Sequence, residues 1–166
     1  KDLIPARHTA SHTPWWIVLL RMTIAALTIM ALARPVYNPA EELPGTGPLR
    51  LVIDSGWAAA QMWDEEMREA HVLTAQAGRA GREVYILTTA PGTDGRIFAP
   101  GPLSAGQAEG VLKGLKPQPW PADYKLAVEN VSDKNMDTVW LAHGLDEGGI
   151  EKLMEALQRR GSLAYI

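Results

Sequence analysis

Apolar residues follow two different patterns along the chain, and the change between them divides the chain in two. Near the start, an almost unbroken apolar run extends from Pro14 to Ala33. A run of roughly 20 apolar residues has the length of a helix that crosses a hydrocarbon core of about 30 Å. After Pro48, short apolar runs alternate with stretches of helical periodicity. That alternation is typical of an α/β domain.

The first pattern predicts a transmembrane helix over residues 14–34, which makes the lipid bilayer an expected partner. Trp15 and Trp16 stand where aromatic side chains commonly mark a membrane interface. Arg21 costs roughly 2.5–3.5 kcal/mol if it is held at the bilayer centre. Its position near the start of the run lets the side chain extend to the interface. Arg34 and the helix breaker that follows it end the run.

Two alternatives to a membrane helix remain open. The Ala31-Leu-Ala33 sequence supplies the small-x-small pattern of a signal-peptide cleavage site. A buried helix of a soluble domain is the second alternative, although such a helix is seldom apolar on all faces. The basic juxtamembrane segment over residues 1–13 outweighs Arg34 in positive charge. The positive-inside rule therefore places the start of the chain in the cytoplasm and the later domain outside it.

The second pattern predicts an α/β domain over residues 49–166, after a Pro- and Gly-rich linker over residues 35–48. Helices between successive strands favour a mainly parallel, Rossmann-like sheet with helices on both faces. The final apolar run resembles a strand that is cut short, so we expect the domain to continue beyond the given sequence. The predicted strands are residues 49–53, 84–88, 137–142 and 163–166, and the predicted helices are residues 64–80, a helix that begins at Ser104, and residues 122–131 and 146–160.

Composition excludes several classes of function. The net charge of −3 and the lack of a basic stripe argue against nucleic-acid binding. The chain has no cysteine, so it has no disulfide, thiol nucleophile or zinc knuckle. No G-x-G-x-x-G sequence or P-loop follows the first predicted strand. We therefore expect no cofactor.

Candidate binding residues lie in the loops that follow the first and third predicted strands. In open parallel sheets, ligands bind beyond the carboxyl ends of the strands. Exposed tryptophan is enriched in the interaction hot spots of protein interfaces, and two loop tryptophans are available for such a role. The candidate residues are Asp54, Ser55, Trp57, Trp120, His143 and Asp146.

Three interpretations of these loops stay open. A hydrolase would use Asp54, Ser55 and His143 as carboxylate, hydroxyl and imidazole, although Ser55 lacks the G-x-S-x-G context of a nucleophile elbow. A small-molecule sensor would bind its ligand between Trp57 and Trp120. In the third interpretation, Asp54 and Ser55 hydrogen-bond backbone amides at the strand end, and His143 is an ordinary polar loop residue.

Several segments resemble the BatA-type aerotolerance regulators. The hydrophobic helix of that family ends in Leu-Ala-Arg-Pro, as the present run does at Pro35. The resemblance continues over nearly the whole chain. The other segments that carry it are Pro48-Leu-Arg-Leu-Val-Ile-Asp-Ser-Gly-Trp-Ala58, Ala77-Gly-Arg-Ala-Gly-Arg82, Leu87-Thr-Thr-Ala-Pro91, Pro117-Gln-Pro-Trp-Pro-Ala122 and Val139-Trp-Leu-Ala-His-Gly-Leu-Asp146.

The resemblance implies a bacterial inner-membrane protein of the double-transmembrane-region kind. Its von Willebrand factor A-like domain would face the periplasm, and an earlier membrane helix would precede this sequence. The resemblance also implies a working partnership with a MoxR-type AAA ATPase in envelope integrity. We therefore expect a non-enzymatic, membrane-anchored interaction or scaffold protein that binds other envelope proteins.

The resemblance also bears on metal binding. A-domains often hold Mg²⁺ through a D-x-S-x-S motif after the first strand, a threonine from a middle loop and a later aspartate. Here Asp54 keeps the first position, whereas Gly56 and Ala58 replace the two serines and His143 replaces the later aspartate. Too few oxygen ligands remain for a magnesium site. We therefore predict that the motif is degenerate and binds no metal.

Overall fold

The computed structural model describes residues 14–32, 43–142 and 148–166. The chain divides into two compact units, Lys1–Glu41 and Glu42–Ile166. The predicted segment over residues 1–13 and most of the predicted linker lie outside the described residues, as do the candidate residues His143 and Asp146.

The first unit contains one helix, α1 (Trp15–Leu32), of 18 residues. Thr23 and Thr28 donate hydrogen bonds to the carbonyl oxygens four residues earlier, so their hydroxyls are satisfied within the helix. Most large apolar side chains along α1 are between 49% and 77% exposed, and Ile17 is less exposed than these. In the described part of the chain, no helix is both long enough and apolar enough to cross a membrane. The predicted helix is therefore present, but its membrane-spanning character is not confirmed.

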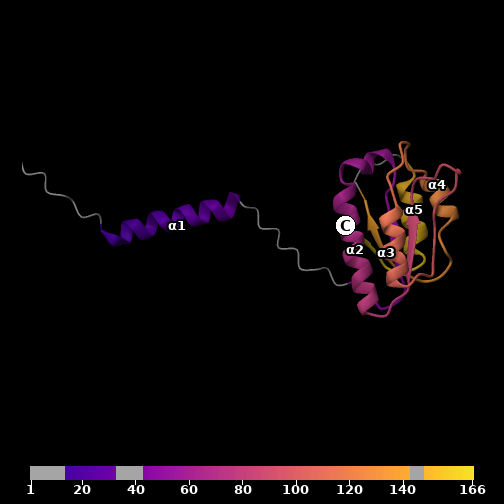
Figure 1. Ribbon diagram of the computed structural model, residues 1–166, viewed down its shortest axis with the longest axis horizontal. Coiled ribbons are helices and arrows are strands. Elements are labelled where there is room, and N and C mark those ends of the chain that lie inside the picture. The colour runs from indigo at the N-terminus through magenta and orange to yellow at the C-terminus, as the bar shows by residue number, and fades with distance from the viewer. Residues whose placement is uncertain (1–13, 33–42, 143–147) are drawn as a thin grey trace, which may run out of the picture. The chain divides into compact units, whose positions relative to one another are not determined.

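The second unit is an α/β domain in which helices lie beside the strands of a sheet (Figure 1). The sheet has four strands, all parallel, in the order β2-β1-β3-β4. Its strands coincide closely with the four predicted apolar runs, and β1, β2 and β3 are buried on both faces. The strands are β1 (Leu49–Ile53), β2 (Val84–Thr88), β3 (Asp137–Leu141) and β4 (Leu163–Tyr165).

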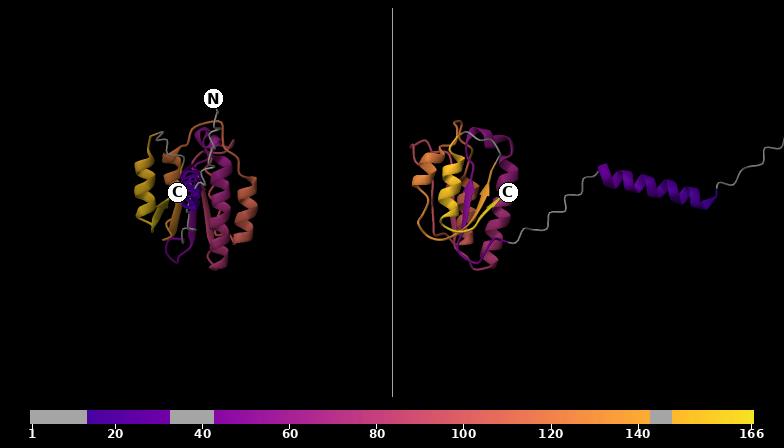
Figure 2. Two further views of the ribbon diagram at one scale, coloured as in Figure 1. Left: turned by 90° about the vertical axis from the view of Figure 1, so that its left-hand side faces the viewer. Right: turned by 180° about the vertical axis from the view of Figure 1, so that it is seen from behind.

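Two helices cover each face of the sheet (Figure 2). The chain passes from β1 to β2 in one direction along the sheet and from β3 to β4 in the other. Because crossovers between parallel strands are right-handed, this reversal places the crossover helices on opposite faces. The short helix η1 (Trp57–Gln61) precedes α2. The helices are α2 (Trp63–Arg79) and α3 (Ala105–Gly114) on one face, and α4 (Tyr124–Glu129) and α5 (Ile150–Gln158) on the other.

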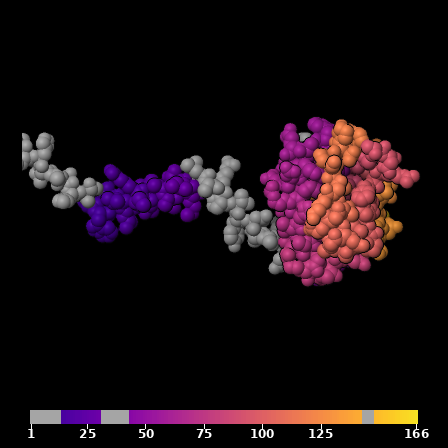
Figure 3. Space-filling view, in the orientation of Figure 1, coloured from indigo at the N-terminus to yellow at the C-terminus, as the bar shows by residue number. Residues whose placement is uncertain are grey.

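The core consists of two apolar layers separated by the sheet. Leu51 and Ile53 pack toward α2 and α3, whereas Val52 and Trp140 pack toward α4 and α5. This alternation follows from the period of two along a strand. On the first face, His71 of α2 lies 2.6 Å from a Glu109 oxygen of α3, and the two helices form one continuous surface (Figure 3).

The outer edge of β2 is covered by a Pro-rich segment rather than by a fifth strand. The segment Phe98–Leu103 runs antiparallel to β2 and accepts hydrogen bonds from the amides of Val84, Ile86 and Thr88. The segment also contains two prolines, which have no N–H to donate to a further strand. Such a segment prevents the edge from pairing with another chain.

Candidate functional site

The candidate residue Asp54 lies at the carboxyl end of β1 and is buried. Its amide donates to the carbonyl of Leu141 at the end of β3, so the loops that follow these two strands begin side by side. The hydroxyl of Tyr124 donates to Asp54 Oδ2 over 3.4 Å. The structure therefore brings the first loop to the point where the order of the strands reverses, which is where ligands bind in open parallel sheets.

Ser55 is a buried structural residue. Its hydroxyl oxygen accepts from the Ala90 amide at 3.1 Å, and its carbonyl accepts from the Gln118 amide at 2.7 Å. Its own amide donates to Thr89 Oγ1 at 3.3 Å. Ser55 thus fastens the loops after β1 and β2 to the segment after α3. This confirms the interpretation in which its side chain satisfies a backbone amide.

Among the candidate residues that the structure describes, Trp57 is the exposed one, and 54% of its surface is accessible to solvent. Its amide donates to the Trp120 carbonyl at 2.9 Å, so the base of the loop is fixed. A side chain at Gly56 would place its Cβ 2.9 Å from the Ala122 nitrogen, and glycine therefore allows this close approach. Met62, at the end of the same loop, is also exposed.

Trp120 differs from Trp57 because its indole N–H forms a hydrogen bond within the domain. It donates to the Pro91 carbonyl at 2.8 Å, and the residue is half-buried. Trp120 therefore joins two loops and offers only part of its ring to a ligand.

Glu66, in the first turn of α2, is a buried acid that sequence analysis missed. It is 8% exposed, and neither of its carboxylate oxygens has a hydrogen-bond partner. Burial raises its pKa from 4.5 to about 7, and the negative charge of Asp54 contributes to the increase. The sequence contains a signal for this burial. Glu66 precedes Ala70 by four residues and Leu73 by seven, and this helical spacing places it on the buried face of α2.

Aromatic side chains form a stack beside Asp54 on the α4–α5 face. Trp140 lies between Tyr124 and Tyr165, with ring-centroid distances of 5.9 Å and 5.4 Å. Burial and the negative charge of Asp54 raise the pKa of Tyr165. Trp140 is fully buried, so its role is in the core, which is the usual place for such a residue.

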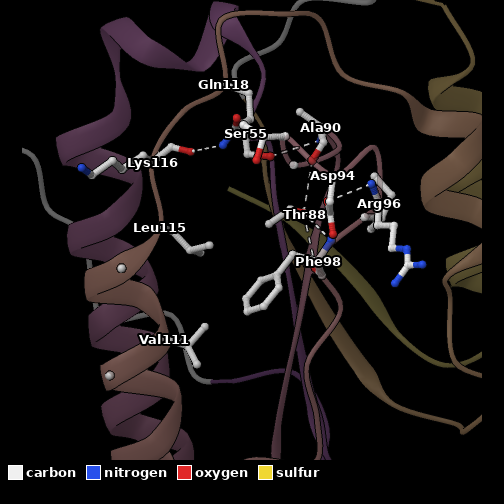
Figure 4. Close-up of a pocket in the computed structure, with 15 residues that line it drawn as sticks. Ser55, Thr88, Ala90, Asp94, Arg96, Phe98, Val111, Leu115, Lys116 and Gln118 are labelled. Carbon is white, nitrogen blue, oxygen red and sulfur yellow. Dashed lines mark hydrogen bonds between the residues drawn. The ribbon is translucent and has the colours of Figure 1, made fainter.

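A cavity of about 620 Å³ opens between the C-terminal half of α3 and the loop that follows β2 (Figure 4). Phe98, Val111 and Leu115 point toward one another and form an apolar wall. Ser55 and Gln118 lie at its polar end. This volume is within the range of small-molecule sites.

A second cavity of about 380 Å³ is bordered by Trp120, Tyr124 and Pro91. Neither cavity is lined by Trp57. The predicted crevice between Trp57 and Trp120 is thus not one of these two spaces.

The described residues of this loop do not fit a magnesium site. Asp54 and Glu66 are buried carboxyl groups close enough to interact, but Gly56 and Ala58 offer no side-chain oxygen as a further ligand. Within the described ranges, no group of three or more His, Asp or Glu side chains is arranged to hold a metal ion.

No protein family matches this chain, and no curated protein matches it. The resemblance to BatA-type proteins therefore rests on the residues quoted above, and what it implies enters below as a proposal.

Proposed function

We propose that this protein is a non-enzymatic interaction protein of the bacterial cell envelope. In this proposal α1 inserts into the inner membrane, and the α/β domain faces the periplasm and binds a protein partner. The observation that carries the proposal is the fixed, exposed position of Trp57 at the carboxyl end of the sheet. A large aromatic side chain has few rotatable bonds, so it loses little conformational freedom on binding and suits an interface anchor.

The exposed surface of α1 supports the membrane part of the proposal. Its large apolar side chains find no cover within the described part of its own unit. Contiguous apolar surface of this kind marks a membrane or protein contact. The apolar run from Pro14 to Ala33 in the sequence favours the membrane.

The place where the chain enters the domain supports the same arrangement. Residues 43–48 lead into β1 at the amino ends of the strands. Trp57 and Met62 lie at the opposite, carboxyl ends. A tether that enters at one end leaves the other end free for a partner.

The non-enzymatic part of the proposal is supported by the hydrogen bonding of Ser55, the candidate nucleophile. The Ser55 hydroxyl is buried and accepts from the Ala90 amide, whereas the described partner of Asp54 Oδ2 is Tyr124. A hydrolase would need a hydroxyl that a substrate can reach.

A direct binding measurement tests the proposal. The partner to test is a periplasmic protein of the envelope that a photo-cross-linker at position 57 captures in intact cells, and the full chain is immobilised in a neutral detergent. We expect Trp57→Ala to weaken binding about 30-fold, which is the scale of a 2 kcal/mol hot spot. Val72→Ala removes another exposed apolar side chain, from the outer surface of α2, and should leave affinity unchanged. Equal binding by wild type and Trp57→Ala contradicts the role of Trp57, and no binding by wild type contradicts this choice of partner.

A small-molecule sensor is the second candidate, and the cavity bordered by Phe98, Val111 and Leu115 favours it. If the cavity holds an apolar ligand, Val111→Trp should fill it and abolish ligand-induced stabilisation in a thermal shift screen. A ligand that stabilises Val111→Trp as strongly as wild type would exclude this cavity as its site.

A further inference from the structure

The cavity of about 620 Å³ between α3 and the loop after β2 has an apolar wall that the domain itself leaves partly uncovered. Phe98 is 46% exposed, and its ring lies in the space between α3 and β2 (Figure 4). Val111 and Leu115 of α3 are half-buried and face this ring across the cavity (Figure 4). Apolar side chains that surround one space of this size favour an apolar occupant.

Helix α3 leaves room for such an occupant because two of its residues have no side chain. Gly110 and Gly114 line the cavity, and a Cβ at either position would meet nothing within 4 Å beyond the helix itself. Glycine is among the poorest helix formers, so both residues weaken α3. No contact inside the domain requires a glycine at these two positions. The space beside Val111 and Leu115 is therefore open to a ligand.

The carboxamide of Gln118 gives the cavity a polar end (Figure 4). Its Nε2 donates to the Lys116 carbonyl at 3.2 Å. A primary carboxamide has two N–H donors and one carbonyl acceptor. Among the described residues, nothing else hydrogen-bonds with this side chain, so one N–H and the carbonyl oxygen remain available. A donor beside an acceptor is the complement of another amide group.

The charged side chains at the border of the cavity do not supply a counter-charge for a ligand. The ammonium of Lys116 and the guanidinium of Arg96 project away from the space between α3 and Phe98 (Figure 4). The Asp94 carboxylate accepts from the Arg96 amide at 3.1 Å within its own turn. A charged ligand group would lose hydration here without gaining a partner of opposite charge. The lining therefore suits a neutral ligand.

We propose that this cavity binds a small neutral molecule with an apolar body and one amide group. The body packs between Phe98, Val111 and Leu115, and the amide pairs with the Gln118 carboxamide. The proposal rests on the second candidate function, in which the cavity is a ligand site, and it adds the chemical class of the ligand. It does not depend on the surface around Trp57, which does not line this cavity.

Thermal unfolding of the full chain in a neutral detergent tests the proposal with three probes that share one phenyl ring. The probes are 3-phenylpropanamide, the ester methyl 3-phenylpropanoate and the anion 3-phenylpropanoate, each at about 5 mM. The amide is the probe that presents both a donor and an acceptor to Gln118. We expect the amide to raise the unfolding midpoint by about 4 °C, the ester by about half as much and the anion by less than about 1 °C.

Three variants locate the effect and cancel any action of the probes on the detergent. Gly114→Leu places a side chain over the helical turn that holds Gly110 and Val111, and it should abolish the shift that the amide produces. Gly106→Leu is the matched control, because a Cβ there also meets open space but Gly106 does not line this cavity. It should keep the full shift. Gln118→Met keeps a side chain of similar length without the carboxamide, and it should make the shifts of amide and ester equal.

The outcomes separate this proposal from the candidate function on which it rests. Equal shifts from the amide and the ester in wild type, both lost in Gly114→Leu, overturn the ligand class but keep the cavity as an apolar ligand site. A larger shift from the anion than from the amide also overturns the ligand class. If no probe produces a shift, or if the shifts persist in Gly114→Leu, both ideas are wrong. Nuclear Overhauser contacts between the amide's ring and the methyl groups of Val111 and Leu115 provide the direct measurement, and contacts found solely elsewhere overturn the site.

Discussion

Arg82 and Asp137 form an ion pair at the point where the chain enters the α/β domain. Arg82 Nη2 lies 2.9 Å from Asp137 Oδ2, and both side chains are largely buried. The same aspartate accepts from the Gly47 amide at 2.8 Å and from the Ser162 hydroxyl at 2.6 Å. Arg82 also donates to the carbonyls of Pro44 and Gly47. The pair therefore fastens the end of the linker to β3 and to the turns before β2 and β4.

Asp137→Asn should destabilise the domain by about 2–4 kcal/mol. The substitution leaves the Arg82 guanidinium largely buried without its counter-charge. Denaturant unfolding monitored by tryptophan fluorescence measures the loss. Glu155→Gln is the matched control, because it breaks the exposed Glu155–Arg159 pair and should cost less than about 0.5 kcal/mol. Equal losses in the two variants would contradict the structural importance of the buried pair.

Glu66 should make the domain less stable as the pH rises from about 4.5 to about 7. Its pKa is higher in the folded state than in the unfolded state. The folded state therefore holds a proton that the unfolded chain releases in this range, and the stability that this proton provides is lost as the pH passes about 7. The expected loss is about 1–3 kcal/mol.

Glu66→Gln should remove this part of the pH dependence. Its control is Glu65→Gln, which changes the exposed neighbour in the same helical turn. Urea unfolding at pH 5, 6, 7 and 8 compares the two variants with wild type. If the free energy of unfolding depends on pH in the same way in Glu66→Gln and in wild type, then Glu66 does not titrate in this range.

Gly56→Ala should destabilise the loop that presents Trp57, by about 1–3 kcal/mol. The added Cβ would lie 2.9 Å from the Ala122 nitrogen, so the backbone must shift. Gly106→Ala in α3 is the control, because its Cβ meets open space. Alanine is the better helix former, so that variant should be more stable by up to about 1 kcal/mol. In thermal unfolding, the midpoint should fall for Gly56→Ala and rise for Gly106→Ala. An unchanged midpoint for Gly56→Ala would contradict the close contact.

Ser55→Ala separates a structural serine from a catalytic one. The substitution leaves the buried Ala90 amide without its acceptor, at a cost of about 1–3 kcal/mol. We expect this loss of stability together with unchanged, background-level turnover of generic ester substrates. A wild-type esterase activity that disappears in Ser55→Ala would instead support the hydrolase alternative.

The positions of the strands could be predicted from the sequence, whereas their order could not. Each strand is a short apolar run bounded by turn residues, which is a local signal. The position of β3 beside β1 depends on where the chain reverses its direction across the sheet, and no local pattern encodes that. The same applies to Arg50, which lies in a correctly predicted strand but whose burial depends on the segment that follows α4.

Helix ends were predicted less well, for identifiable reasons. The helix predicted over residues 146–160 begins at Ile150, because Gly149 precedes it in a left-handed conformation at a φ of 100°. The helix predicted over residues 122–131 is shorter, because the Asp123 side chain caps it by accepting from the Leu126 amide. At the candidate site, the loop and Asp54 were predicted, but the burial of Glu66 was concealed by the exposed acids beside it.

Membrane attachment through α1 is central to the proposed function, and vesicle flotation tests it most directly. The full chain is mixed with neutral phosphatidylcholine vesicles, which exclude charge-driven adsorption, and is centrifuged through a density gradient. We expect the wild type to float with the vesicles. Ile24→Lys combined with Leu27→Lys places two charges on α1, at roughly 2.5–3.5 kcal/mol each near the bilayer centre, and should remain in the dense fraction. The control, Val72→Lys combined with Ala75→Lys, adds the same charge to the exposed surface of α2 and should float. A wild type that does not float, or an α1 variant that floats as well as wild type, would contradict the claim.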